Sequence, residues 1–152
     1  MMQPWLPAKA GRMMDLGCHT GWFCREFKRA GWQTFGIERA PDWAELARTL
    51  DPQGDYLTAD VFTVEFAECD VALCLSLAMY LFDDLERGWE LFRRISQAAP
   101  LMFLDFGGMY ANRLPFTEST VIEQMVGNTL YRDGLLLGRT AFEERPFFLF
   151  ER

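Results

Sequence analysis

The residues best suited to chemistry near the start of the chain are Asp15, Gly17 and Gly21, which stand in the segment MMDLGCHTG. An apolar run of strand length stops at the acidic residue, turns through the glycines and continues into the amphipathic stretch TGWFCREFKRAG. This pattern predicts a parallel strand, a tight turn and a helix. Strand ends in an open α/β sheet form a crevice into which helix-terminal amides point, so we expect a ligand at this turn.

The two glycines narrow the kind of ligand that the turn could hold. Glycine takes positive φ readily and has no Cβ, so a ligand can come close to the backbone amides near Gly17 and Gly21. A dinucleotide fingerprint would need glycines at positions 17, 19 and 22, whereas the chain has His19 and Trp22. The sequence therefore argues against a pyrophosphate cradle for NAD.

The remaining pattern, D-x-G-x-x-x-G, resembles motif I of the class I S-adenosylmethionine-dependent methyltransferases, which often reads DLGCGTG. One position differs, because His19 stands where that family usually has glycine. The resemblance implies S-adenosylmethionine as the cofactor, with a binding loop that contains Asp15, Gly17, Cys18, His19 and Gly21. In it Asp15 would either hold loop amides or bind the ammonium group indirectly, and Cys18 and His19 would offer backbone amides. For the His19 side chain we weigh an ordinary loop position against a catalytic base and favour the former.

Two further acids end predicted strands. Glu38 ends the strand TFGIE and lies 23 residues after Asp15, near the ~20-residue interval of nucleotide-binding folds. The resemblance implies that Glu38 accepts both ribose hydroxyls, and a solvated strand end is the alternative. Asp60 ends DYLTAD, where the family's carboxylate accepts the adenine amino group and the next amide, here that of Val61, meets a ring nitrogen. An ordinary turn aspartate is the alternative for Asp60.

The mouth of the predicted fourth strand offers a further contact region. Leu75, Ser76 and Leu77 end the apolar run VALCLSL. The resemblance implies backbone and apolar contacts there with the methionine part and the adenine of the cofactor. A plain core strand is the alternative.

The acceptor side is harder to read from the sequence. The stretch CLSLAMY lacks the Asn/Asp-Pro-Pro-Tyr/Phe/Trp signature of amino-directed nucleic-acid methyltransferases. Among the soft or aromatic residues Met79, Tyr80, Met109 and Tyr110, we choose Tyr80 as the substrate contact, with simple packing as the alternative. Asp105 is the carboxylate that could act as a base on this side.

The hydrophobic pattern alternates strands and helices along the chain. After the first strand and helix it predicts strands at 34–38, 55–60, 71–77 and 101–106, helices at 41–50 and from Asp83 or Asp84 to about Ala98, a short helix capped by Thr117 or Thr120, and a hairpin joined near Arg145 and Pro146. This order predicts an α/β fold with a Rossmann-like, mostly parallel seven-stranded sheet flanked by helices and a C-terminal antiparallel hairpin. It resembles the methyltransferase order of elements. We expect residues 1–152 to form a single S-adenosylmethionine-dependent methyltransferase-like domain.

Two apolar groups carry expectations about burial. In the helix that begins at Pro41, the spacing i, i+3, i+4 and i+7 of one buried stripe is occupied by Trp43, Leu46, Ala47 and Leu50. At the end of the hairpin, residues 147–150 are expected to be exposed, and their apolar character suggests a homodimer.

The composition excludes several classes of protein. The chain has 152 residues, of which 50% are hydrophobic, and no apolar stretch reaches the ~20 residues that span a bilayer. The first residues lack the apolar region of a secretory signal. A formal charge of −7 repels phosphate, so we expect neither nucleic acid nor a membrane as partner. Four cysteines without C-x-x-C spacing and a single histidine predict reduced thiols in a cytoplasmic protein and no metal site.

The resemblance implies a methyltransferase that moves a methyl group to a small-molecule or protein acceptor by in-line displacement. Placement does most of the catalysis in such a reaction, which accounts for the lack of a visible catalytic triad. The alternative is a noncatalytic cofactor-binding or partner-binding module that keeps the fold. The short chain, with little sequence before its first predicted strand, favours that alternative.

Overall fold

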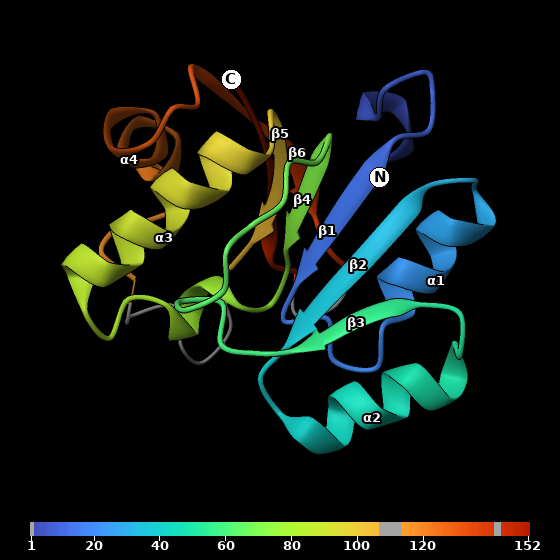
Figure 1. Cartoon of the computed structure of the whole chain (residues 1–152). Helices are drawn as coiled ribbons and strands as arrows, with labels where there is room; N and C mark the ends of the chain where they lie inside the picture. Colours follow the sequence, from blue (N-terminus) through green and yellow to red (C-terminus); the bar gives the residue numbers. More distant parts are fainter. Residues whose placement is uncertain (1, 107–113, 142–143) are drawn as a thin grey trace.

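The structure is a computed structural model that describes residues 2–106, 114–141 and 144–152. In these residues one seven-stranded sheet has the order β3-β2-β1-β4-β5-β7-β6 (Figure 1). The strands are β1 (Arg12–Leu16), β2 (Gln33–Glu38), β3 (Asp55–Thr58), β4 (Val71–Cys74), β5 (Leu101–Asp105), β6 (Asp133–Arg139) and β7 (Pro146–Glu151). Strands β1 to β5 pair in parallel, and β7 runs antiparallel to both β5 and β6. The predicted fold class is confirmed.

Helices cover both faces of the sheet. Figure 1 shows α1 (Trp22–Arg29) and α2 (Pro41–Leu50) on one side, and α3 (Leu85–Ala98) and α4 (Val121–Asn128) on the other. Two 3-10 turns complete the described part, η1 (Gln3–Trp5) and η2 (Ala78–Tyr80). None of the helices in the described ranges combines the length and apolar character that crossing a bilayer requires.

Local sequence explains where two of these helices begin. A proline occupies the first turn of α2, where its missing N–H costs no hydrogen bond and its fixed φ suits the helix. The Asp84 side chain caps α3 by accepting a hydrogen bond from the backbone N–H of Arg87 at 3.0 Å. The predicted starts of both helices are therefore confirmed.

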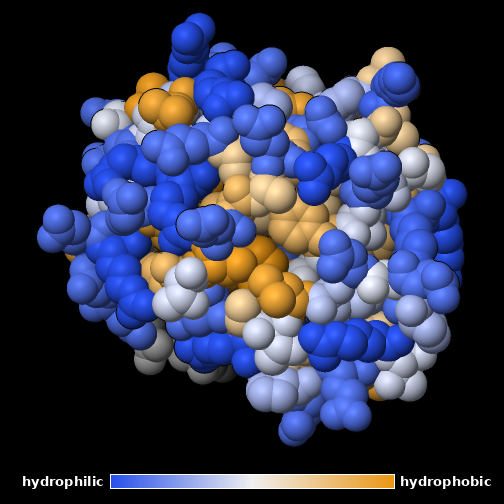
Figure 2. Space-filling view, viewed as in Figure 1, coloured by the Kyte–Doolittle hydropathy of each residue, from blue (hydrophilic) through white to orange (hydrophobic). Residues whose placement is uncertain are grey.

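The core lies in two layers because alternate strand side chains point to opposite faces. On β4, Val71 and Leu73 pack on the α1–α2 side, and Ala72 and Cys74 pack on the α3–α4 side. Coverage of both faces explains the unbroken apolar run of this strand. Seen from the side of Figure 1, apolar side chains gather near the middle of a mostly hydrophilic surface (Figure 2).

Two strands end earlier than predicted, and this moves predicted site residues into turns. Strand β3 ends at Thr58, so Asp60 lies in the following turn. Strand β4 ends at Cys74, and Ser76 takes a φ of 56°, a left-handed conformation that cannot continue a strand. The leucines that flank Ser76 therefore belong to a turn at the carboxyl end of the sheet.

The predicted buried stripe of α2 is wrong for its large side chains. Trp43, Leu46 and Leu50 are 43%, 37% and 50% exposed, whereas Ala44 and Ala47 are fully buried. The helix is rotated so that its small residues face the sheet. The small side chains let the helix backbone approach closely, and the larger apolar residues remain at the surface.

The expectation that residues 147–150 are exposed is also wrong. Strand β7 inserts between β5 and β6, and all four of these side chains are at least 93% buried. The outer strand is β6 instead, with a register shift between Leu136 and Gly138. The burial removes the surface on which the homodimer prediction depended.

Candidate functional site

The turn after β1 is built from left-handed backbone. Gly17, His19 and Gly21 have φ angles of 71°, 51° and 71°. The carbonyl oxygen of Ile37 on β2 accepts hydrogen bonds from the N–H groups of Gly17 at 2.8 Å and Cys18 at 3.0 Å. His19 stands where the family usually has glycine and adopts a conformation that glycine adopts at no steric cost. The predicted turn through two glycines is present.

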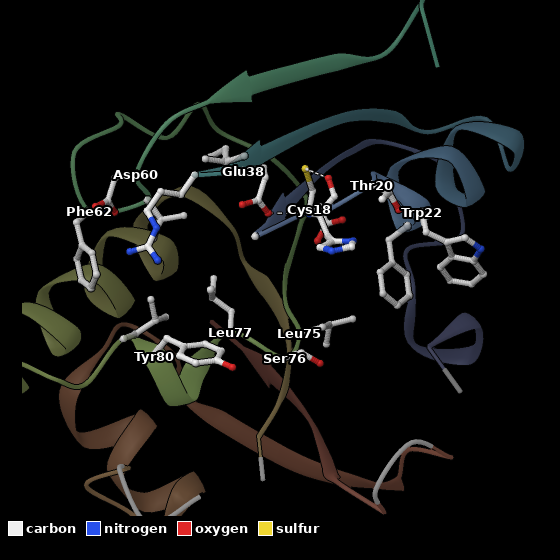
Figure 3. Close-up of a pocket in the computed structure, with 18 residues that line it drawn as sticks. Cys18, Thr20, Trp22, Glu38, Asp60, Phe62, Leu75, Ser76, Leu77 and Tyr80 are labelled. Atoms are coloured by element: carbon white, nitrogen blue, oxygen red, sulfur yellow. Dashed lines mark hydrogen bonds between the residues drawn. The ribbon is translucent and has the colours of Figure 1, made fainter. Parts of the chain in front are cut away.

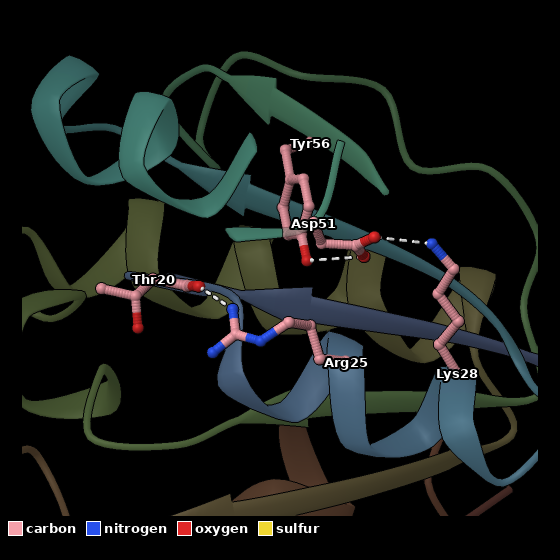
Figure 4. Close-up of polar contacts among 5 residues, drawn as sticks. All are labelled: Thr20, Arg25, Lys28, Asp51 and Tyr56. Atoms are coloured by element: carbon pink, nitrogen blue, oxygen red, sulfur yellow. Dashed lines mark hydrogen bonds and ion pairs between the residues drawn. The ribbon is translucent and has the colours of Figure 1, made fainter. Parts of the chain in front are cut away.

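Gly21 lies beside the cavity that the turn encloses, and its lack of a side chain makes room for Tyr56. A Cβ at this position would stand 2.5 Å from the Tyr56 ring. Figure 4 shows the polar contacts along α1, made by Thr20, Arg25, Lys28, Asp51 and Tyr56. The Tyr56 hydroxyl donates to Asp51 at 3.3 Å, and Lys28 forms an ion pair with the same carboxylate at 2.7 Å. The Arg25 guanidinium donates to the Thr20 carbonyl oxygen at 2.5 Å, so side chains fix the turn from below.

Asp15 is buried at the base of the turn, with an exposed fraction of 3%. Its Oδ2 accepts a hydrogen bond from the Cys24 thiol at 3.8 Å. Burial, together with the nearby charge of Glu38, raises the pKa of Asp15 from 3.8 to about 7, and the Cys24 hydrogen bond opposes this. The amides of Gly17 and Cys18 donate to the Ile37 carbonyl oxygen and not to Asp15, so an indirect contact with the ammonium group is the predicted role that remains for Asp15 beside these two amides.

Glu38, at the end of β2, is held in place by backbone amides. Its Oε2 accepts from the His19 N–H at 2.9 Å, and its Oε1 accepts from the Ala40 N–H at 2.8 Å. Each carboxylate oxygen has more than one acceptor site, so capacity for further hydrogen bonds remains. The tips of β1 and β2 are thus joined through one fixed carboxylate.

Asp60 and Val61 form a turn beyond β3. The Asp60 Oδ1 accepts from the Phe62 N–H at 3.0 Å, and the Asp60 carbonyl oxygen accepts from the Thr63 N–H at 2.9 Å. Among the described residues, none accepts a hydrogen bond from the Val61 N–H. The Arg87 guanidinium carbon lies 4.1 Å from the centre of the Phe62 ring. The Asp60 carboxylate thus supports the local turn and lies at the carboxyl end of the sheet.

Ser76, after β4, is fixed by a residue of β5. Its N–H donates to the Oδ1 of Asp105, and its hydroxyl accepts from the Arg145 guanidinium at 2.5 Å. Asp105 is 6% exposed, and burial raises its pKa, whereas the Ser76 amide and the Arg145 charge act in the opposite direction. Asp105, the candidate base, therefore holds the Ser76 turn.

These turns enclose a cavity of about 440 Å³, within the usual size of small-molecule sites. Gly21 and Asp105 lie outside its lining. The predicted residues that line it are Asp15, Gly17, Cys18, His19, Glu38, Asp60, Val61, Leu75, Ser76, Leu77 and Tyr80. In Figure 3, Glu38 and Cys18 lie along one side, and Leu75, Ser76, Leu77 and Tyr80 along the other. Asp60 and Phe62 stand at one end, and Thr20 and Trp22 at the other. The structure therefore brings four separate segments of the chain to one site.

Sequence reasoning missed several residues of the cavity lining: Thr20, Trp22, Phe23, Ile37, Arg39, Phe62 and Leu81. Most of them directly follow a residue that was predicted, so adjacency to the strand ends is the signal that would have found them. Tyr80 reaches the lining with an exposed fraction of 48%. Met109 and Tyr110 lie outside the described residues.

Residues 14–103 match the family model described as a methyltransferase domain, and the chain belongs to this family. Malonyl-[acyl-carrier protein] O-methyltransferase of Pectobacterium atrosepticum is 32% identical over 91 residues, which are 58% of this chain and 36% of that protein. The chain thus spans about a third of the length of the curated relatives it matches. The predicted membership of the class I S-adenosylmethionine-dependent methyltransferases is confirmed.

Solved structures share the fold at low sequence identity. Magnesium protoporphyrin IX methyltransferase from Synechocystis PCC 6803, with bound S-adenosylmethionine, superposes with a TM-score of 0.73 at 16% identity. That match covers 92% of this chain and 69% of the other. The PH0226 protein from Pyrococcus horikoshii gives a TM-score of 0.70 at 14% identity, over 99% of this chain and 88% of the other. At such identities the likeness describes the fold alone.

Proposed function

We propose that this chain binds S-adenosylmethionine in the cavity at the carboxyl ends of β1 to β4 and transfers its methyl group to a small-molecule or protein acceptor. The observation that carries this proposal is the gathering of the motif I turn, Glu38, Asp60 and the Ser76 turn around one cavity. Family membership supports it. The relatives named O-methyltransferases support the reaction class.

The residues present fit this cofactor. At Gly17 the backbone is left-handed, and a Cβ would stand 3.2 Å from the Leu77 side chain, so glycine keeps the wall open. The Glu38 carboxylate, positioned by two amides, is a suitable acceptor for a pair of neighbouring ribose hydroxyls. The Val61 N–H and the Asp60 carboxylate offer a donor and an acceptor at the end of the cavity assigned to adenine.

When bound, S-adenosylmethionine supplies an electrophilic methyl group on a sulfonium whose leaving group departs neutral. The chain's own part is to bind and to orient. Glu38 and Asp60 give the cavity two carboxylates, which complement a cationic ligand. Phe23, Leu75 and other apolar side chains in the lining exclude water. Restricting the reactants in this way lowers the barrier of an in-line displacement, so the proposal requires no catalytic triad.

The proposal is tested first with Glu38→Ala. We expect S-adenosylmethionine affinity, measured by calorimetry, to fall at least tenfold because the ribose hydroxyls lose a fixed acceptor, whose hydrogen bonds are worth about 1.5 kcal/mol or more. Circular dichroism should show the fold retained. The matched control is Glu45→Ala, an exposed acid on α2 outside the cavity, which should bind as the wild type does. Unchanged binding in Glu38→Ala would remove Glu38 from the site.

Catalysis is separated from mere binding by incubating the protein with methyl-labelled cofactor and cell extract. Labelled product supports the transferase, and tight binding without turnover supports the noncatalytic module. The Glu38→Ala protein serves as the blank.

We also infer that residues 1–152 form one methyltransferase-like domain and that the protein acts in the cytoplasm. The near-complete superposition on the PH0226 protein supports the first inference. Four free, buried cysteines in the described residues support the second, because they fit a reducing compartment. A homodimer is tested by measuring the mass in solution.

A further inference from the structure

A second cavity, of about 420 Å³, lies beside the cofactor cavity. Phe23, Leu75 and Ser76 line both, so the two cavities share a wall. The remaining lining comes from distant parts of the chain and includes Met2, Asp105 and Phe147. This second cavity therefore adjoins the cofactor site at the turn after β4, without any of the acids that line the first.

The interior of the second cavity is mainly apolar. Met2, Phe23, Leu75 and Phe147 are its large apolar side chains, and Asp105 is the charged side chain in the lining that the described residues form. Its Oδ1 accepts from the Ser76 N–H, which fixes the carboxyl group, and acceptor capacity remains on both oxygens. Burial of Asp105 raises its pKa and reflects the same apolar surroundings.

The charges around Asp105 discriminate among classes of ligand. The nearby Arg145 guanidinium donates to the Ser76 hydroxyl and lies outside the lining. An acidic ligand would therefore bring a second carboxylate beside Asp105 in an apolar space, which costs free energy. A neutral hydroxyl group would instead give Asp105 a hydrogen bond without burying a second charge. The apolar wall suits a hydrocarbon or aromatic body.

We propose that this second cavity binds the methyl acceptor, and that the acceptor is an uncharged, mainly apolar small molecule whose hydroxyl group donates a hydrogen bond to Asp105. The role of the ligand as methyl acceptor rests on the proposed function. The chemistry of the ligand rests on the cavity alone. It narrows the acceptor from a small molecule or protein to one class. It also gives Asp105 a second contact besides the Ser76 amide.

The test measures binding by calorimetry with 2-naphthol as the neutral probe and 2-naphthoate as its acidic counterpart. We expect 2-naphthol to bind the wild type at least tenfold more tightly than 2-naphthoate. Ala141→Trp places a large side chain in the lining and should weaken 2-naphthol at least tenfold. Ala67→Trp, at an exposed position that lines neither cavity, is the matched control and should bind as the wild type does.

A second variant keeps the proposal falsifiable if Ala141→Trp does not fold. Asp105→Asn removes the charge and keeps an acceptor oxygen, so the preference for 2-naphthol over 2-naphthoate should shrink at least fivefold. An unchanged preference overturns the role of Asp105, and tighter binding of 2-naphthoate than of 2-naphthol to the wild type overturns the ligand class. Equal 2-naphthol affinity in Ala141→Trp and Ala67→Trp overturns the location.

The cofactor is titrated separately into each variant. S-adenosylmethionine should bind Ala141→Trp and Ala67→Trp within twofold of the wild type. If it binds none of the proteins, the proposed function fails while the naphthol results still decide whether the cavity takes a neutral hydroxyl compound.

Discussion

The two cavities are neighbours but are built in different ways. The first is framed by backbone turns at consecutive strand ends, with Asp15, Glu38 and Asp60 beside left-handed or tightly bonded residues. The second is walled by apolar side chains that come from distant parts of the chain and that surround the carboxyl group of Asp105. Backbone turns leave a local sequence signature, whereas a wall assembled from remote side chains leaves none. A cofactor site built from such turns can therefore be recognised from the sequence, whereas a cavity walled by remote side chains cannot.

The buried acids of the two cavities differ in their partners, and this difference gives the largest effect expected at the cavities. Burial raises the pKa of Asp15 to about 7 in the folded chain from the ordinary aspartate value of 3.8, so the folded chain holds this proton more tightly. The contribution of Asp15 to stability is therefore greatest below pH 4 and is lost as the pH rises to 7. Relative to Asp15→Asn, the wild type should lose about 3 kcal/mol of unfolding free energy between pH 5 and 8.

Urea unfolding at both pH values measures this difference. Asp105→Asn is the matched variant and should change the pH dependence less, because the Ser76 amide and the Arg145 charge stabilise the ionised form of Asp105. Equal pH dependence of the wild type and Asp15→Asn would contradict a raised pKa for Asp15.

The reliance of the first cavity on backbone geometry is tested by Gly21→Ala. The new Cβ would meet the Tyr56 ring at 2.5 Å and force a left-handed conformation, so we expect a loss of about 2–3 kcal/mol of unfolding free energy. Cofactor affinity should fall with it, and 2-naphthol binding should change little in the protein that remains folded.

Gly127→Ala is the control for this change. Gly127 lies in α4, and a Cβ there meets nothing within 4 Å, so alanine should raise stability by about 0.5–1 kcal/mol. Denaturant titration of both variants gives the comparison. A loss at Gly127 equal to that at Gly21 would mean that the turn has no special requirement for glycine.

The smallest effect is expected at the outer rim of the first cavity. The Trp43 ring lies 4.0 Å from the His19 ring and is 43% exposed, so Trp43→Ala should cost about 1 kcal/mol or less. Trp89→Ala, at a position 7% exposed and packed against Phe82, should cost about 3–5 kcal/mol. Thermal unfolding of the two variants measures the loss of stability at the exposed Trp43 and at the buried Trp89. Similar losses of stability would indicate that Trp43 is buried, as the sequence predicted for α2.

The sequence was sufficient for the order of elements and for the first cavity, because both depend on local signals. The Asp15 to Gly21 turn, Glu38 and Asp60 all follow short apolar runs, and the structure brings them together. The burial of the side chains of α2 could not be predicted from local sequence signals. The spacing of Trp43 fits a helix stripe, but the sheet accepts Ala44 and Ala47 instead, a choice that only tertiary packing makes.

Long-range pairing accounts for the other differences. The burial of residues 147–150 depends on the insertion of β7 between β5 and β6, which no local pattern encodes. The structural role of Asp105 is to accept a hydrogen bond from the N–H of Ser76, which lies 29 residues away in the sequence. Such contacts set both the wall of the second cavity and the end of β4.

The register shift between Leu136 and Gly138 has a consequence for encounters between copies of the chain. Strand β6 stands at the margin of the sheet, where unsatisfied backbone groups can template the addition of a foreign strand. An irregularity in that strand bends it and interrupts the even spacing that continuous addition needs. The register shift therefore makes β6 a poorer template for the addition of a strand from another copy of the chain.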